Sequence, residues 1–86
     1  MKVVAVGNKE ALLGFLLAGI NKRLETEDPE EAVRFLHRLE KKESSSLVIV
    51  TSELYSKIRE EIERISSRNP SFIFYNFSGG GLKWRK

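Results

Sequence analysis

The alternation of strand-like and helix-like segments constrains the fold of this chain most strongly. Apolar runs at Val3–Val6, Leu47–Thr51 and Ser71–Phe77 are typical of strands, and the short charged run Arg23–Thr26 is typical of an edge strand. Strands that alternate with helices predict a parallel sheet with right-handed crossovers. The sequence therefore predicts an α/β fold: a single-domain three-layer sandwich with a four-stranded parallel sheet, βαβαβαβ in the order 2-1-3-4, receiver-like or Rossmann-like.

The first predicted helix, Lys9–Lys22, follows a capping Asn8 and is apolar almost all round. Small residues reduce the bulk of one of its sides: Gly14, Ala18 and Gly19. A helix side made of small residues lets another backbone approach closely. Each glycine inside the helix lowers helix stability by about 1 kcal/mol relative to alanine. We therefore expect this side to pack tightly, either on the sheet of the same chain or on a partner.

The two later helices have clear start signals. Asp28 is an acidic cap, Pro29 stands at the first helical position, and Glu31 is placed to close a capping box. Ser52 is expected to cap one continuous third helix to Ile65, whose apolar residues are spaced by four, four and three. Both helices are amphipathic, so each is expected to cover the sheet with one face.

Length and composition limit the classes of protein that this chain can represent. Its 86 residues suit one domain, which we place at residues 1–78, followed by a Gly-rich joint and basic tail at 79–86. The sequence has no cysteine, and His37 is its only histidine. Disulfide scaffolds, zinc ribbons, iron–sulfur sites and thiol catalysis are therefore excluded.

The net charge of +3 comes from the end of the sequence. Within residues 1–82 the 12 acidic residues are matched by 12 basic ones, and Lys83, Arg85 and Lys86 carry the excess. A body with balanced charge is not expected to bind nucleic acid. The longest apolar run, Ala11–Ile20, is too short to span a bilayer, and the N-terminus lacks the pattern of a signal peptide, so we expect a cytoplasmic protein.

The positions after the strands, where parallel sheets bind ligands, lack the motifs of known sites. After Gly7 the next glycine is Gly14, too late for a dinucleotide fingerprint, and no phosphate-binding loop is present. A receiver domain needs an aspartate at the end of the third strand, where this chain has Thr51 and Ser52. We therefore assign no catalytic residue, no cofactor and no metal.

Two ordered segments carry a resemblance to a known family. Lys2–Asn8 followed by Leu13–Ile20 resembles the opening of the F subunit of archaeal-type (A-type) and vacuolar-type (V-type) rotary ATPases, a strand, a polar turn and a Gly-Phe-x-Leu-Ala-Gly helix. Leu47–Thr51 and the helix containing Ile58–Ile62 look like the third strand and following helix of that family. The similarity covers roughly residues 1–75. The segment Tyr75–Gly79 departs from the family because it lacks the usual Ile-Pro turn.

The resemblance implies a non-catalytic subunit of the central rotor shaft, bound to the coiled-coil D subunit, with the catalytic A and B subunits as further candidate partners. Such a subunit helps couple ATP synthesis or hydrolysis to ion or proton transport and is peripheral to the membrane through its complex. The partner surface is expected to comprise Gly14, Phe15, Ala18, Gly19, Thr51 and Ser52. On this expectation, Gly19→Leu weakens stalk binding and leaves the domain folded.

Two alternative functions remain at this stage. Leu47–Phe77 is also similar to the core of the kink-turn-binding ribosomal proteins, and the basic tail suits phosphate contacts, although the balanced body argues against RNA binding. A small-molecule enzyme that uses Glu10 and Glu53 above the sheet is the other alternative. No base, metal or nucleophile set accompanies those two acids in the sequence.

Overall fold

The sheet has four parallel strands in the order β2-β1-β3-β4, which confirms the predicted topology. The computed structural model of the chain describes residues 2–20 and 22–77. The predicted tail at 79–86 therefore lies outside the described residues. The strands are β1 (Lys2–Gly7), β2 (Lys22–Glu25), β3 (Ser46–Thr51) and β4 (Phe72–Phe77).

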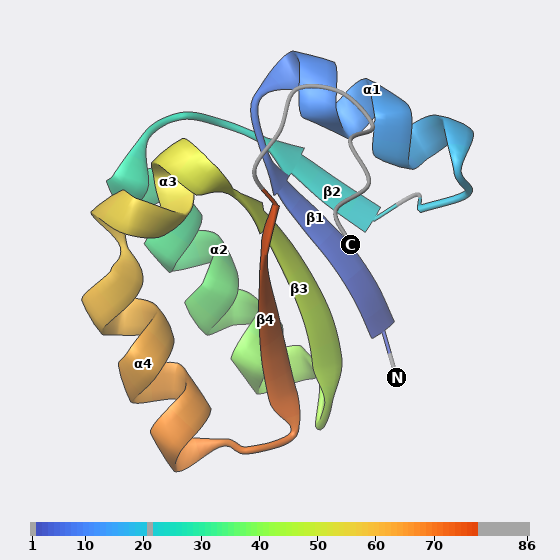
Figure 1. The fold of residues 1–86 in the computed structure, drawn as a ribbon. Coiled ribbons are helices and arrows are strands. Elements are labelled where there is room, and N and C mark those ends of the chain that lie inside the picture. Colours follow the sequence, from blue (N-terminus) through green and yellow to red (C-terminus); the bar gives the residue numbers. More distant parts are fainter. Residues whose placement is uncertain (1, 21, 78–86) are drawn as a thin grey trace, which may run out of the picture.

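Helices cover the two faces of the sheet unequally. α1 lies on one side of the sheet, and α2, α3 and α4 lie on the other, so the fold has three layers as predicted (Figure 1). The helices are α1 (Lys9–Leu17), α2 (Pro29–Lys42), α3 (Ser52–Lys57) and α4 (Arg59–Arg68). The single short helix α1 is thus the only described helix on its face of the sheet.

The main core lies between the sheet and the layer formed by α2, α3 and α4. Successive strand residues point to opposite faces of a sheet, and the even-numbered ones face this core. The buried strand residues of the core are Val4, Val6, Val48, Val50 and Phe72, and they pack with Ala32, Leu36, Leu39, Leu54, Ile58, Ile62 and Ile65 of the helical layer and its α3–α4 junction. The odd-numbered strand residues therefore face the side that carries α1.

α2 begins at the predicted cap, but the capping box does not form. Asp28 Oδ1 accepts a hydrogen bond from the Glu30 backbone N–H at 3.1 Å. Glu31 instead accepts the hydroxyl hydrogen of Thr26 at 2.6 Å, and the Thr26 oxygen accepts from the Asp28 backbone N–H at 3.0 Å. In a capping box, Glu31 would accept a hydrogen bond from the Asp28 backbone N–H. Here that N–H donates to Thr26 instead.

α1 ends five residues earlier than predicted, at Leu17 rather than Lys22. Gly19 has φ = +96°, a left-handed conformation that favours glycine. The Gly19 N–H donates to the Leu16 carbonyl at 3.0 Å, and the Ile20 N–H donates to the Phe15 carbonyl at 2.9 Å. This pair of bonds is a Schellman motif, which satisfies the last carbonyls of the helix and turns the chain into β2.

The prediction of one continuous helix from Ser52 to Ile65 was wrong. The helix breaks at Ile58, where φ is −117° and ψ is +21°, into α3 and α4. Ile58 is buried at this break and still belongs to the core. Ser52 is the first helical residue rather than the cap, because the cap position is held by Thr51, whose side chain makes no capping hydrogen bond.

Candidate interaction surface

α1 is held to the sheet by few side chains. It starts because Asn8 Oδ1 accepts a hydrogen bond from the Ala11 backbone N–H at 2.9 Å. Among its residues, all of which the structure describes, Leu12 alone is buried. Phe15 is half-buried, and its ring contacts that of Phe77 edge-on, with 4.9 Å between centroids and 68° between planes. The helix therefore rests on the sheet through one leucine and one aromatic pair.

The rest of α1 presents apolar side chains to solvent. Leu17 is 81% exposed, Leu13 is 57% exposed, and Leu16 is also exposed. Contact of water with apolar surface costs about 25 cal/mol per Å², and contiguous exposed apolar patches mark places that another molecule covers. We call this set, together with its small neighbours, the α1 surface: Leu13, Gly14, Leu16, Leu17 and Ala18.

The small residues of the α1 surface do not pack on the sheet of the chain itself. A Cβ added at Gly14 would meet no heavy atom within 4 Å, and Ala18 is exposed. Of the two expectations for this side of the helix, packing on a partner therefore remains. Gly19 also borders open space, but its positive φ gives it a separate role as the end of the helix.

The structure places Phe15, Thr51 and Ser52 close to the carboxyl end of the sheet. Thr51 is a register partner of Phe77, the residue whose ring Phe15 contacts. Thr51 is buried, so its side chain is not available at the surface of the isolated chain, and Ser52 is half-buried. Of the residues expected at the partner surface, Gly14, Ala18 and Gly19 are exposed.

A second apolar area lies on the sheet itself, on the face that carries α1. Tyr75 is 57% exposed and Ile73 is 51% exposed, and Val3 of β1 is also exposed. The register places Val3, Leu47 and Ile73 in one row across β1, β3 and β4. We call Val3, Ile73 and Tyr75 the open sheet face.

Sequence reasoning missed Leu13, Leu17, Ile73 and Tyr75. A signal for the two leucines was present, because a helix that is apolar all round buries only the side that faces its sheet. For Ile73 and Tyr75, the signal was that β4 has apolar residues on both faces although it is an edge strand. Both signals point to more apolar surface than residues 2–20 and 22–77 bury among themselves.

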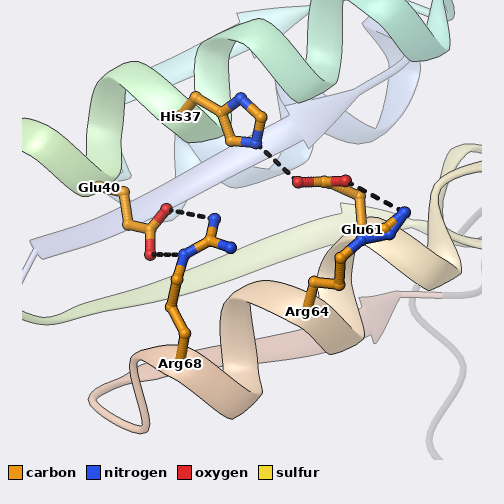
Figure 2. A network of polar contacts seen from close by, with 5 residues as sticks. All are labelled: His37, Glu40, Glu61, Arg64 and Arg68. Atoms are coloured by element: carbon orange, nitrogen blue, oxygen red, sulfur yellow. Dashed lines mark hydrogen bonds and ion pairs between the residues drawn. The ribbon is translucent and has the colours of Figure 1, made fainter.

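The opposite face of the molecule carries a polar network that joins α2 to α4 (Figure 2). His37 Nε2 donates to Glu61 Oε2 at 2.6 Å, and Arg64 approaches the other oxygen of Glu61 at 3.6 Å. Arg68 donates two hydrogen bonds to the carboxylate of Glu40, at 3.1 and 3.0 Å. The hydrogen bond from His37, assisted by the nearby Arg64, lowers the pKa of Glu61 below its ordinary value.

This network borders a groove but offers no evident chemistry. The groove, of about 680 Å³, lies between the start of α2 and the junction of α3 and α4. Acidic and basic side chains both line it, among them Glu30, Arg34 and Arg59, so it presents no field of a single sign. Within residues 2–20 and 22–77, no group of three or more metal-ligating side chains occurs, and no helix has the length and hydrophobicity needed to cross a membrane.

Comparison with known proteins decides the family. The model of the family described as ATP synthase (F/14-kDa) subunit matches residues 3–75, which is most of the chain. The chain belongs to this family.

The chain is similar to proteins from several archaea that are named as the F subunit of A-type ATP synthase. It is 33% identical to the protein of Methanocaldococcus jannaschii over 66 residues, which cover 77% of this chain and 67% of the relative. It is 30% identical to the protein of Methanospirillum hungatei JF-1 over 88 aligned positions, which cover 100% of this chain and 88% of the relative. The resemblance seen in the sequence is thereby confirmed.

Membership in the ATP synthase F-subunit family gives the exposed apolar surfaces a context. A subunit of an ATP synthase belongs to a complex with other subunits, and the surfaces that meet those subunits are exposed when the chain is considered alone. The α1 surface and the open sheet face have the apolar character expected of such contacts.

Proposed function

We propose that this ATP synthase subunit is a non-catalytic part of the central rotor shaft, bound to the coiled-coil D subunit. In this role it turns with the shaft and helps couple ATP synthesis or hydrolysis to ion transport. It lies on the cytoplasmic side, peripheral to the membrane, with the catalytic A and B subunits as further neighbours. The observation that carries the proposal is α1, a nine-residue helix with one buried residue and an exposed apolar remainder.

The shape of the α1 surface suits packing against another helix. Leu13 and Leu17 are four residues apart and form a ridge along the helix, and Gly14 and Ala18, also four apart, form the neighbouring groove. A ridge beside a groove of small residues accepts a facing helix with an interaxial distance of about 8 Å, at the short end of the usual range. A coiled coil presents long helical ridges of this kind.

The apolar character of the contact predicts its response to salt. Charge pairs on exposed surfaces are screened at high ionic strength, whereas apolar burial is not. Lys9 and Glu10, in its first turn, are the charged residues of α1. The complex with the coiled-coil subunit should therefore survive high salt.

The first experiment is co-expression of the full chain with the coiled-coil D subunit of the same organism. Size-exclusion chromatography with in-line light scattering is then run at low and at high salt. A one-to-one complex at both salt concentrations is the expected result. A monomer at both salt concentrations would contradict the proposal.

A matched pair of variants locates the contact. Leu17→Glu places a charge on the α1 surface at a residue that is 81% exposed, and should weaken the complex at least tenfold, about 1.4 kcal/mol or more. Ser67→Glu places the same charge on α4, on the other side of the sheet, and should leave the affinity unchanged. Equal affinities for both variants would show that α1 does not make the contact.

A further inference from the structure

The two edges of the sheet differ in how they are protected. β2 forms one edge with four residues, of which Lys22, Arg23 and Glu25 are charged. β4 forms the other edge with six residues, Phe72–Phe77, and none of them is charged. Charged side chains and short length are the usual means by which proteins prevent an edge strand from pairing with another chain. β2 has both of these features and β4 has neither.

Exposed apolar surface gathers beside the unprotected edge. Ile73 and Tyr75 are the two most exposed large apolar side chains of the sheet, and both belong to β4. β3 is the only described strand that pairs with β4, and Figure 1 shows β4 at the outer limit of the sheet. An uncharged strand with one free edge and exposed apolar side chains is a template for strand addition.

We propose that the free edge of β4 pairs with β4 of a second copy of this chain. The two strands run antiparallel about a two-fold axis perpendicular to the sheet, so that the sheets of the two copies become continuous. This contact goes beyond the proposed rotor function, because it uses the edge of β4 rather than the α1 surface.

The sequence of β4 suits pairing with itself. A two-fold axis perpendicular to the sheet keeps equivalent faces on the same side, so residues of the same parity lie opposite one another. With the axis at Tyr75, that residue faces its own copy and Ile73 faces Phe77, all on the side of the open sheet face. On the core side, Phe74 faces Asn76. Pairs of aromatic and β-branched residues are among those that stabilise antiparallel strands.

The absence of charge makes β4 compatible with a second copy of itself. In a self-paired strand, a charged residue at the axis faces the same charge, which is unfavourable. β4 contains no charged residue, so no such repulsion arises. Six residues make a small contact compared with a standard interface of about 1,600 Å². The dimer is therefore weak and forms as the concentration of free protein rises.

The test is sedimentation velocity of the full chain from low to high micromolar concentration. The expected result is a monomer that converts to a dimer as concentration increases. Tyr75→Lys places two ammonium groups at the axis and should keep the chain monomeric throughout. Leu17→Lys, which adds the same charge to an exposed apolar position on α1, should leave the dimer intact. Circular dichroism should show that both variants are folded, because both side chains are exposed.

Three outcomes would overturn the proposal. One is a monomer at the highest concentration, and another is a dimer that persists in both Tyr75→Lys and Asn76→Lys. Loss of the dimer in Leu17→Lys would place the contact on α1 instead. Binding of the D subunit is measured separately, so failure here leaves the rotor proposal standing.

Discussion

Gly7 stands at the end of β1 where the backbone passes close to the side chain of Thr51 on β3. A Cβ added at Gly7 would lie 2.2 Å from Thr51 Cγ2 and 2.8 Å from Thr51 Cβ, closer than real atoms approach. Because Thr51 is buried, its side chain has little room to move away. The close approach of β1 and β3 at their carboxyl ends therefore depends on a residue without a side chain.

Gly7→Ala should lower the free energy of unfolding by about 1–3 kcal/mol, since it overpacks this contact. Gly14→Ala is the matched control, because the same added methyl group enters open space on a helix. The control should raise stability by about 0.5–1 kcal/mol. Urea denaturation followed by circular dichroism measures both. Equal midpoints for Gly7→Ala and the wild type would show that β1 and β3 adjust without cost.

Glu61 should make stability depend on pH in the acid range. Its hydrogen bond from His37 holds its folded pKa below the ordinary carboxyl value, so the folded state binds a proton less readily than the unfolded state. The resulting stabilisation is present at and above the ordinary carboxyl pKa and is lost as pH falls through the folded pKa. Glu61→Gln removes this contribution.

The measurement for Glu61 is the thermal midpoint of wild type and Glu61→Gln from neutral to acid pH. The wild type should be the more stable at neutral pH, and the difference should shrink as pH falls. Glu63→Gln, which neutralises a neighbouring exposed carboxylate on α4, serves as the comparison for a general change in charge. A difference that stays constant with pH would mean that the bond between His37 and Glu61 does not stabilise the fold.

At the scale of single elements, the starts of α1 and α2 were predictable from the sequence, whereas the end of α1 was not. Asn8 and Asp28 cap as predicted because capping depends on a side chain and the few backbone groups beside it. From the sequence pattern, Gly19 was expected within the first helix, on the side formed by small residues. In the structure it adopts a positive φ and ends the helix. A glycine in a helical pattern is compatible with both roles, and only the backbone angle distinguishes them.

The break between α3 and α4 was hidden by the same spacing that predicted a helix. Leu54, Ile58 and Ile62 all face the core, before, at and after the break. A spacing of apolar residues shows which side chains are buried and does not show whether the helix axis keeps its direction. The structure turns at Ile58 while keeping that residue in the core.

The position of Gly19 changes what its substitution should do. Gly19→Leu puts a branched side chain at φ = +96° and should lower stability by about 1–3 kcal/mol, a cost that the expectation of a folded variant did not include. Gly19→Asn should cost less, because asparagine tolerates left-handed conformations. Thermal denaturation of both variants tests this order. A Gly19→Leu variant as stable as the wild type would show that the turn after α1 rearranges freely.

At the scale of the whole molecule, the order of the sheet was predictable but the use of its surfaces was not. Right-handed crossovers leave few arrangements for strands that alternate with helices, so the order followed from the element pattern. Apolar residues on α1 indicated that the helix would be covered. They did not indicate whether the same chain or a partner supplies the cover, because both satisfy the same preference for burial.

The unequal layers predict unequal local stability. α1 rests on Leu12 and the pair of Phe15 and Phe77, whereas β1 and β3 lie inside the sheet above the main core. Backbone amides of α1 should therefore exchange with deuterium by local opening, faster than those of β1 and β3. Exchange followed by mass spectrometry measures this, and addition of the D subunit should slow exchange in α1. Equal protection of α1 and β3 in the free chain would argue against the weak attachment.

The central place of β1 has a consequence for how the chain is made. β1 lies between β2 and β3, and the Ser46 hydroxyl donates to the Lys2 carbonyl at 2.8 Å across 44 positions of sequence. Of the four described strands β1 is translated first, yet one side of that strand has no neighbour until β3 has been translated. The core that covers the apolar face of β1 also contains Ile62, Ile65 and Phe72, which are translated later still. The sheet therefore cannot be completed around β1 until β3 has been translated, and β2 is the only described neighbour that can pair with β1 before then.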